Sequence, residues 1–167
     1  MSQIPAELTI IPAQESDIPL LLDFIRKLAD YEQLSTEVVA DESTLRESLF
    51  GSKPAAEVLL AYWANQAVGF AVYFHNFSTF IGRPGIYLED LFVIPAFRGK
   101  GVGKALLSHL AGIAQKRNCA RLEWAVLDWN QPAIDFYRRL GAIPMHDWTV
   151  FRVADTALGE LARHSLA

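Results

Sequence analysis

The stretch of this sequence with the clearest chemistry is a glycine- and lysine-rich run at residues 98–104, Arg-Gly-Lys-Gly-Val-Gly-Lys. An apolar, strand-like run at 86–94 precedes it, and a helix-like run at 102–117 follows. The first turn of a helix has backbone N–H groups without partners and the positive end of the helix dipole, and glycine lets a phosphate approach the backbone. The run therefore predicts an anion-binding turn; a solvated glycine turn is the alternative.

Two common phosphate-binding loops do not fit this run. A Walker loop has four residues between its first glycine and the Gly-Lys pair and then Ser or Thr, whereas here the spacing is one residue too short and Ala105 follows. A dinucleotide fingerprint needs a third glycine where this chain has Leu106. The pattern that remains is Arg-x-x-Gly-x-Gly at 98–103, after a strand.

Two adjacent carboxylates, Glu89 and Asp90, interrupt the apolar run at 86–94. Side chains on a strand alternate, so we expect the two carboxylates to point to opposite faces of the strand. Because both flanks are hydrophobic, at least one of them is expected to be half-buried, and either functional or tightly paired. A structural salt bridge is the alternative for each.

The segment 130–137, Asn-Gln-Pro-Ala-Ile-Asp-Phe-Tyr, is a second candidate site. Ala133 and Tyr137 are four residues apart and share one face of a predicted helix. A buried tyrosine hydroxyl requires a hydrogen-bond partner, so Tyr137 is a candidate proton donor. Taken alone, a helical tyrosine also fits simple core packing.

The elements that position these residues follow from hydrophobic periodicity and from Gly and Pro boundaries. The sequence predicts strands at 8–11, 58–63, 68–74, 86–94, 121–127 and 148–153, and helices from Ser16 or Asp17, at 41–50, 102–117 and 131–140, and in the C-terminal tail. Asn65-Gln66 is the predicted hairpin turn. A hairpin that leads into a strand–helix–strand–helix unit predicts a mixed α/β domain.

Composition limits the class of protein. The chain has 167 residues, is 51% hydrophobic and 20% charged, and carries a net charge of −4, which favours one folded domain and disfavours nucleic acid as a partner. The single Cys119 and the polar start at 1–7, which does not resemble a signal peptide, predict a cytoplasmic protein. No apolar run is long enough for a membrane span, and no His, Cys or Asp spacing indicates a metal site.

Five segments occur in an order that resembles the GNAT superfamily of acyl-CoA-dependent N-acyltransferases, at 28–32, 87–90, 98–103, 125–131 and 136–142. Within that superfamily the chain is similar to the spermidine/spermine N-acetyltransferase branch and its thialysine-acetylating relatives, over about residues 7–153. The resemblance implies a single domain over 1–167 with a GNAT-type mixed, mostly antiparallel central sheet flanked by helices. It also implies a homodimer, and an enzyme that moves the acetyl group of acetyl-CoA directly to a primary amine.

The resemblance also implies roles for individual residues. Acetyl-CoA would be held by Leu91, Phe92 and Val93 along the strand, by Arg98, Gly99, Lys100, Gly101, Val102, Gly103 and Lys104 in the turn, and by Asn130, Pro132, Ala133 and Tyr137. The acceptor amine would contact Tyr31, Glu32, Glu89, Asp90 and Trp148. Glu89 would remove a proton from the amine, directly or through water, and Tyr137 would protonate the departing thiolate.

Where this chain departs from the polyamine enzymes it is less acidic; for example, Thr79 stands where they carry an acid. The sequence therefore favours a small amine with a lysine-like or short diamine skeleton over spermine. A protein or peptide N-acetyltransferase, a non-catalytic acyl-CoA sensor, and a structural domain with a relic loop are the alternatives.

Overall fold

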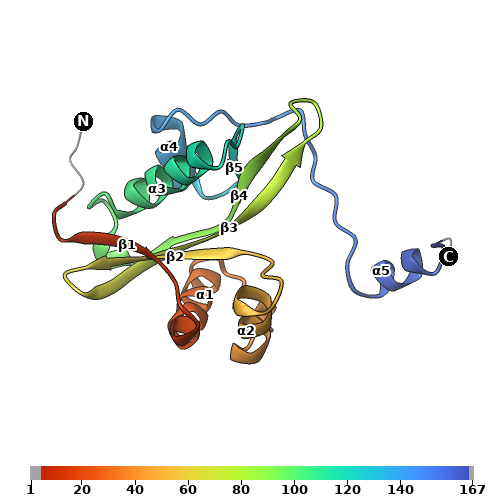
Figure 1. Cartoon of the computed structure of the whole chain (residues 1–167), viewed down its shortest axis with the longest axis horizontal. Helices are drawn as coiled ribbons and strands as arrows, with labels where there is room; N and C mark the ends of the chain where they lie inside the picture. The colour runs from red at the N-terminus through yellow and green to blue at the C-terminus, as the bar shows by residue number, and fades with distance from the viewer. Residues whose placement is uncertain (1–4, 166–167) are drawn as a thin grey trace. The chain divides into compact units, whose positions relative to one another are not determined.

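The computed structural model describes residues 5–165, which form two compact units, one up to Ala125 and one from Val126 (Figure 1). Each unit is described by itself. Part of the polar start at 1–7, and the last two residues of the domain predicted over 1–167, lie outside the described residues. No helix in the described range is both long and apolar enough to cross a membrane.

The N-terminal unit is built on a five-stranded sheet with the strand order β1-β2-β3-β4-β5. The strands are β1 (Leu8–Pro12), β2 (Glu57–Trp63), β3 (Gln66–Ser78), β4 (Arg83–Val93) and β5 (Leu122–Trp124). Neighbours from β1 to β4 are antiparallel, and β5 is parallel to β4. The predicted mixed, mostly antiparallel sheet is therefore confirmed.

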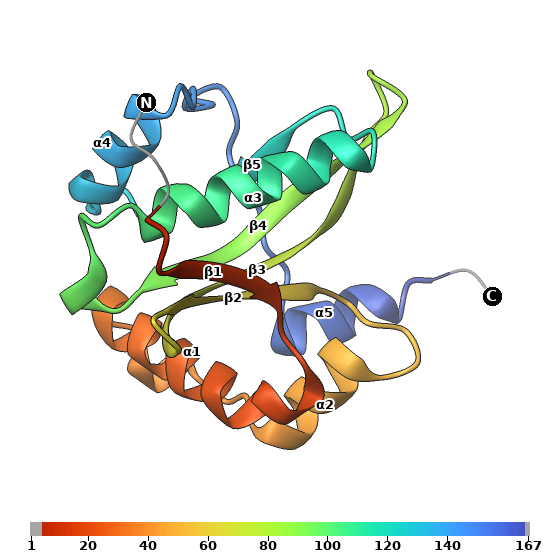
Figure 2. The ribbon, with the colours of Figure 1, turned by 60° about the vertical axis from the view of Figure 1, so that its left-hand side comes forward.

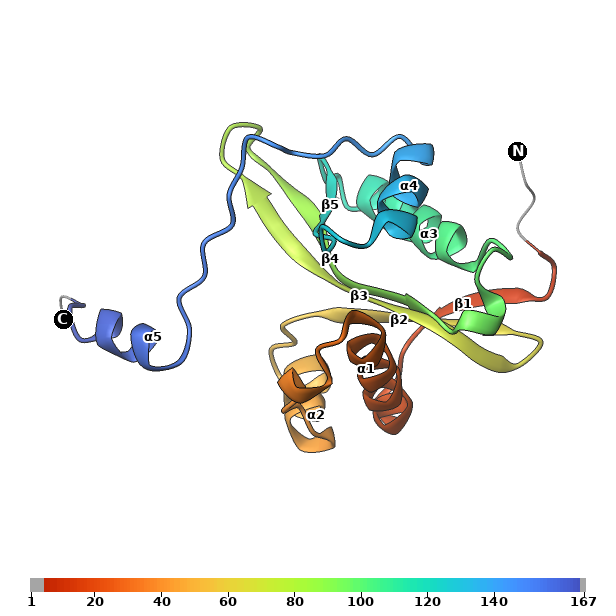
Figure 3. The ribbon, with the colours of Figure 1, turned by 180° about the vertical axis from the view of Figure 1, so that it is seen from behind.

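Helices cover both faces of this sheet. α1 (Ile18–Glu32) and α2 (Glu42–Phe50) lie on one face, and α3 (Val102–Lys116) lies on the other (Figures 2 and 3). Short 3-10 turns, η1 (Glu15–Asp17), η2 (Ser35–Glu37) and η3 (Pro95–Phe97), join these elements. The chain from β4 through η3 to α3 is the strand–turn–helix predicted around residues 98–104.

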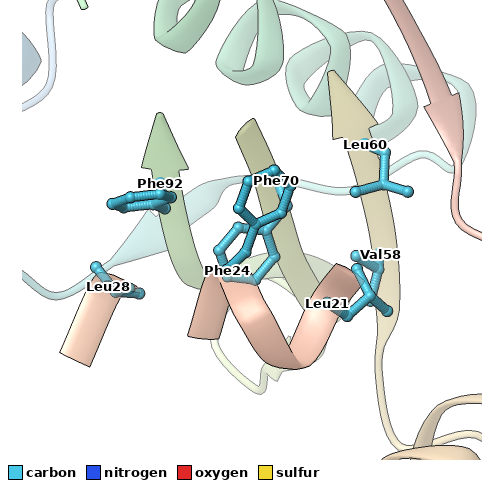
Figure 4. Packing of buried hydrophobic residues seen from close by; sticks show 7 residues of the cluster. All are labelled: Leu21, Phe24, Leu28, Val58, Leu60, Phe70 and Phe92. Carbon is cyan, nitrogen blue, oxygen red and sulfur yellow. The ribbon is translucent and has the colours of Figure 1, made fainter. Parts of the chain in front are cut away.

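Periodic apolar residues of α1 form the core on its side of the sheet. Leu21, Phe24 and Leu28 recur at helical spacing, and all three are buried. They pack against Val58 and Leu60 of β2, Phe70 of β3 and Phe92 of β4 (Figure 4). The rings of Phe24 and Phe70 are stacked with centroids 5.6 Å apart. This core connects α1 to the C-terminal half of β4, where the carboxylates lie.

The boundaries of α1 and α2 follow from local chemistry. Asp41 caps α2 by accepting a 2.8 Å hydrogen bond from the Thr44 N–H, as a predicted start at residue 41 requires. At α1, Pro19 occupies the first turn. Asp17, one of the two predicted caps, instead accepts a hydrogen bond from the Gln14 N–H at 2.8 Å and makes no cap bond to α1.

Two predicted details of the sheet are wrong. The hairpin turn consists of Ala64 and Asn65, both with positive φ, because Gln66 already pairs with Trp63. β5 has only the three residues 122–124 of the predicted 121–127.

The C-terminal unit contains α4 (Gln131–Arg139) and α5 (Asp155–Ala162), which confirms the predicted helix at 131–140 and the helical tail. Gly141 follows α4 with φ 89°, a conformation suited to ending a helix. The strand predicted at 148–153 is wrong, since the described structure has no strand there. A segment rich in β-branched and aromatic residues forms a strand only where a partner strand supplies the hydrogen bonds.

An ion pair ties β2 to the end of α3 and provides a first prediction. The carboxylate of Glu57 accepts two hydrogen bonds from the Arg117 guanidinium, one of them 2.7 Å from Nη2, and this lowers the pKa of Glu57. A lowered carboxyl pKa stabilises the fold above the unfolded-state pKa, and the gain is lost as the pH falls through the folded pKa.

We therefore expect Glu57→Gln to lower the free energy of unfolding at pH 7 by about 1 kcal/mol, since both partners are partly exposed. The difference in the free energy of unfolding between the parent protein and the variant should become smaller toward pH 3. Urea unfolding at both pH values measures it, and Asp23→Asn, at the exposed Lys27 pair on α1, should cost less. A loss at pH 3 equal to that at pH 7 would contradict the ion-pair explanation.

Candidate active site

The candidate site begins at a β-bulge in β4. Val72 of β3 pairs with Asp90, but the next residue, Tyr73, pairs with Leu88, so Glu89 is an extra residue on β4. A bulge interrupts the regular alternation of side chains, so strand alternation alone does not fix the relative faces of Glu89 and Asp90. Glu89 is exposed and Asp90 is partly buried. The sequence showed the two acids but not the bulge that presents them.

Beyond the bulge, one edge of β4 has no partner in the described sheet. β5 pairs with β4 only over 86–88, while β3 continues along the other edge as far as Val93. The β5-side edge of 89–93 is therefore open to an extended ligand that forms main-chain hydrogen bonds. Leu91 and Val93 lie there, partly buried, whereas the side chain of Phe92 belongs to the core.

The turn at 98–104 has the backbone of an anion cradle. Gly99 and Gly101 have φ 75° and 89°, and no atom beyond the glycine and its two chain neighbours lies within 4 Å of a Cβ built on either. Gly101 is the N-cap residue of α3, no side chain caps that helix, and the first helical bond runs from the Ala105 N–H to the Gly101 carbonyl at 2.9 Å. The N–H groups of the first turn, including those of Val102, Gly103 and Lys104, precede that bond. The turn therefore fits a phosphate group.

An acidic groove lies beside β4. Its volume is about 300 Å³, and it is lined by Ile25, Leu28, Ala29, Glu32, Leu34, Glu37, Val38, Val39, Ala40 and Asp90. Two of the predicted acceptor residues, Glu32 and Asp90, thus line one groove. Sequence reasoning missed Glu37, which belongs to η2 and has no motif around it. Three acids and no basic residue line this groove, so it suits a cationic ligand.

The acids in and near this groove influence one another. Burial is the largest cause that raises the pKa of Asp90, and the negative charges of Glu89 and Glu32 raise it further, to about 6. Burial also raises the pKa of Glu32. A carboxyl group with a pKa near neutrality is suited to accept a proton from an amine. Asp90 is thus a second candidate base beside Glu89.

Two other predicted acceptor residues, Tyr31 and Trp148, belong to different units. Tyr31, in the last turn of α1, packs against the core, and the guanidinium of Arg98 lies 4.3 Å from the centre of its ring. Trp148 belongs to the C-terminal unit and is 72% exposed.

The other predicted residues of the C-terminal unit start α4. Asn130 is buried and caps the helix by accepting a hydrogen bond from the Ala133 N–H at 3.3 Å, with Pro132 in the first turn. The ring of Tyr137 lies 5.3 Å from that of Phe136. Asn130, Pro132 and Ala133 thus form the beginning of one helix, and Tyr137 follows one turn later.

A larger cavity, of about 400 Å³, contains none of the predicted site residues; its lining includes Leu49, Phe50, Glu57, His109 and Arg117. Among residues 5–165, no group of three or more His, Cys, Asp or Glu side chains is placed to hold a metal ion.

A sequence model described as "Acetyltransferase (GNAT) family" matches residues 24–142, a span that includes β4, the 98–104 turn and α4. The chain belongs to the GNAT acetyltransferase family. The resemblance drawn from the sequence motifs is thereby confirmed, and so is the class of enzyme, an acetyltransferase.

Individual GNAT relatives match nearly the whole chain. A thialysine N-epsilon-acetyltransferase of Bos taurus is 40% identical over 161 residues, covering 90% of this chain and 94% of the relative. An L-ornithine N5-acetyltransferase of Arabidopsis thaliana is 30% identical, with 87% and 84% covered. Among solved structures, an integron cassette protein from the mobile metagenome of V. cholerae superposes with a TM-score of 0.80 at 28% identity, covering 95% of this chain and 99% of that one.

The raised pKa of Asp90 leads to a second prediction. A carboxyl group with a folded pKa above its unfolded value is stabilised by the fold as the protonated form, so stability is lost as the pH rises through the folded pKa. Ionised Asp90 therefore destabilises this GNAT protein above about pH 6.

We expect Asp90→Asn to raise the free energy of unfolding at pH 7.5 by about 1 kcal/mol, after allowance for solvent screening, and to change little at pH 4. Thermal unfolding across this pH range measures the effect, and Glu57→Gln should show the opposite sign. A destabilised Asp90→Asn protein at pH 7.5 would mean that a stabilising contact of the carboxylate outweighs its burial.

Proposed function

We propose that this GNAT acetyltransferase transfers the acetyl group of acetyl-CoA directly to a primary amine of a small molecule with a lysine-like or short diamine skeleton. The observation that carries the proposal is the acidic groove with Glu32 and Asp90, which lies beside the open edge of β4. The thialysine and ornithine relatives, whose names describe acetylation of a side-chain amine, support it.

Residues 98–104 and the open edge at 91–93 are the proposed binding site for the donor. The backbone N–H groups of the turn would hold the diphosphate, and main-chain groups of Leu91 and Val93 would pair with the pantetheine arm. The donor carries its acetyl group as a thioester, so the CoA thiolate leaves when the acetyl group is transferred to the amine. A backbone N–H near Leu91 would stabilise negative charge on the acetyl oxygen as the amine attacks. Asn130, Pro132 and Ala133 at the start of α4 are proposed to complete this site.

The acceptor is drawn to the groove as an ammonium ion, but only a neutral amine can attack. We assign proton removal to the acidic pair on β4: Glu89, directly or through water, with Asp90 as the partner whose pKa of about 6 suits the same task. Tyr137 is proposed to protonate the departing thiolate. Tyr31, Glu32 and Trp148 are proposed as acceptor contacts.

Thiol release from acetyl-CoA tests the function. Thialysine, lysine, ornithine, putrescine, spermidine, spermine and short peptides are compared at equal concentration. We expect the highest kcat/KM for a lysine-like amino acid or a short diamine. A preference for peptides would establish the rival protein or peptide acetyltransferase, whereas tight CoA binding without thiol release would establish a non-catalytic sensor.

The homodimer, the cytoplasmic location and the single domain over 1–167 belong to the same proposal and rest on the family resemblance and the composition. Size-exclusion chromatography with light scattering tests the dimer.

A further inference from the structure

The side chain of Arg98 makes contacts that set it apart from the rest of the 98–104 turn, the proposed binding site for the donor diphosphate and called the donor turn below. Its Nε donates a 2.9 Å hydrogen bond to the carbonyl of Val93. Its guanidinium carbon lies 4.3 Å from the centre of the Tyr31 ring and 5.7 Å from that of Phe92. Val93 and Phe92 belong to the end of β4, and Tyr31 lies in the last turn of α1. One side chain therefore joins the donor turn, β4 and α1.

These contacts use properties that are specific to arginine. The planar guanidinium stacks on an aromatic ring while its Nε donates in a fixed direction, and a lysine ammonium cannot do both. Lys100, on the same turn, shows the contrast. Its Nζ lies 4.5 Å from the ring centre of Phe97, within its own segment, and 5.9 Å from that of Trp63.

The residue next to Tyr31 connects Arg98 to the acidic groove. Glu32 follows Tyr31 at the end of α1 and lines the groove together with Asp90. The position of this last turn relative to β4 therefore determines the separation of Glu32 and Asp90. Arg98 holds that turn from one side and the end of β4 from the other.

We propose that the side chain of Arg98 positions the acceptor groove by fixing the last turn of α1 against β4, and that this side chain does not bind the donor diphosphate. Only the backbone at residue 98 then remains part of the proposed donor site, whereas the sequence resemblance implies that Arg98 as a whole holds acetyl-CoA. The inference rests on the proposed function for the identity of the groove. The contacts themselves do not depend on it.

Arg98→Lys separates the two roles, because it keeps the charge and loses the stacked, directional contact. We expect the KM for the amine to rise about tenfold, while the affinity for CoA, measured by calorimetry, stays within about twofold of the parent protein. Acetyl-pantetheine, which lacks the diphosphate, provides a second readout. The ratio of kcat/KM between acetyl-CoA and acetyl-pantetheine should be the same in parent and variant.

The opposite result would overturn the proposal: CoA affinity falls tenfold or more, the two donors become more alike, and the KM for the amine is unchanged. Arg46→Lys is the matched control, since Arg46 makes a comparable Nε contact, 3.0 Å to Glu15, away from the groove. It should behave as the parent protein in every assay.

Tyr31→Leu is a second test of the proposal. It keeps the proposal testable if the Arg98 variant does not fold. It removes the ring that Arg98 contacts, so it should raise the KM for the amine as Arg98→Lys does. The double variant should be no worse than the single variants, whereas additive losses would refute the coupling. If the parent protein releases no thiol with any amine, the proposed function fails, but the CoA affinities still decide whether Arg98 binds the diphosphate.

Discussion

Replacing Tyr137 with Phe should lower the turnover number about a hundredfold and leave the affinity for acetyl-CoA nearly unchanged. A thiolate is a poor leaving group without a proton, and a positioned general acid contributes at least this factor to the rate. Phenylalanine keeps the ring that lies beside Phe136 and removes only the hydroxyl. The variant therefore tests the loss of the hydroxyl proton while the ring packing of α4 is kept.

Single-turnover kinetics are the appropriate measurement, because steady-state turnover can be limited by product release. Tyr62→Phe, which removes a hydroxyl from β2, is the matched control and should keep the turnover of the parent protein. Normal single-turnover rates in Tyr137→Phe would remove this residue from the mechanism and leave the thiolate to be protonated by water.

Replacing Gly101 with Val should raise the KM for acetyl-CoA by tenfold or more, with a smaller effect on turnover. Gly101 has φ 89°, a conformation that costs a β-branched residue on the order of 1–3 kcal/mol. Because a Cβ at this position meets no atom within 4 Å beyond the residue and its two chain neighbours, the cost comes from the backbone conformation and not from a clash. The relaxed backbone of the variant would turn the N–H groups of the first turn of α3 away from the diphosphate.

Gly82→Val is the control for strain alone. Gly82 has φ 68°, is equally open, and lies in the loop between β3 and β4. It should lose a similar amount of stability and keep the KM for acetyl-CoA. If Gly101→Val binds acetyl-CoA as tightly as the parent protein, the 98–104 turn is not the donor site, and the fit of its backbone to a phosphate is coincidental.

Much of the fold could be predicted from the sequence because the relevant signals are local. The apolar spacing of α1, the capping residue Asp41 and the glycines before α3 each act over a few residues. Predictions that needed a partner strand were weaker. The strand expected at 148–153 is absent from the described structure, and β5 is shorter than its β-rich sequence suggests. Strand formation depends on hydrogen bonds to another part of the chain, which local propensity does not specify.

The features of the candidate site also fall into two groups, those that the sequence indicates and those that only the tertiary structure reveals. Residue types and short spacings were sufficient to identify the strand–glycine turn–helix at 98–104, the paired acids of β4 and the start of α4, since these are properties of neighbouring residues. The tertiary structure alone decided that Glu89 lies in a bulge, that Glu37 lines a groove with Asp90, and that Arg98 stacks on Tyr31. Register, burial and ring contacts arise when segments far apart in the chain pack together, and no pattern within either segment encodes them.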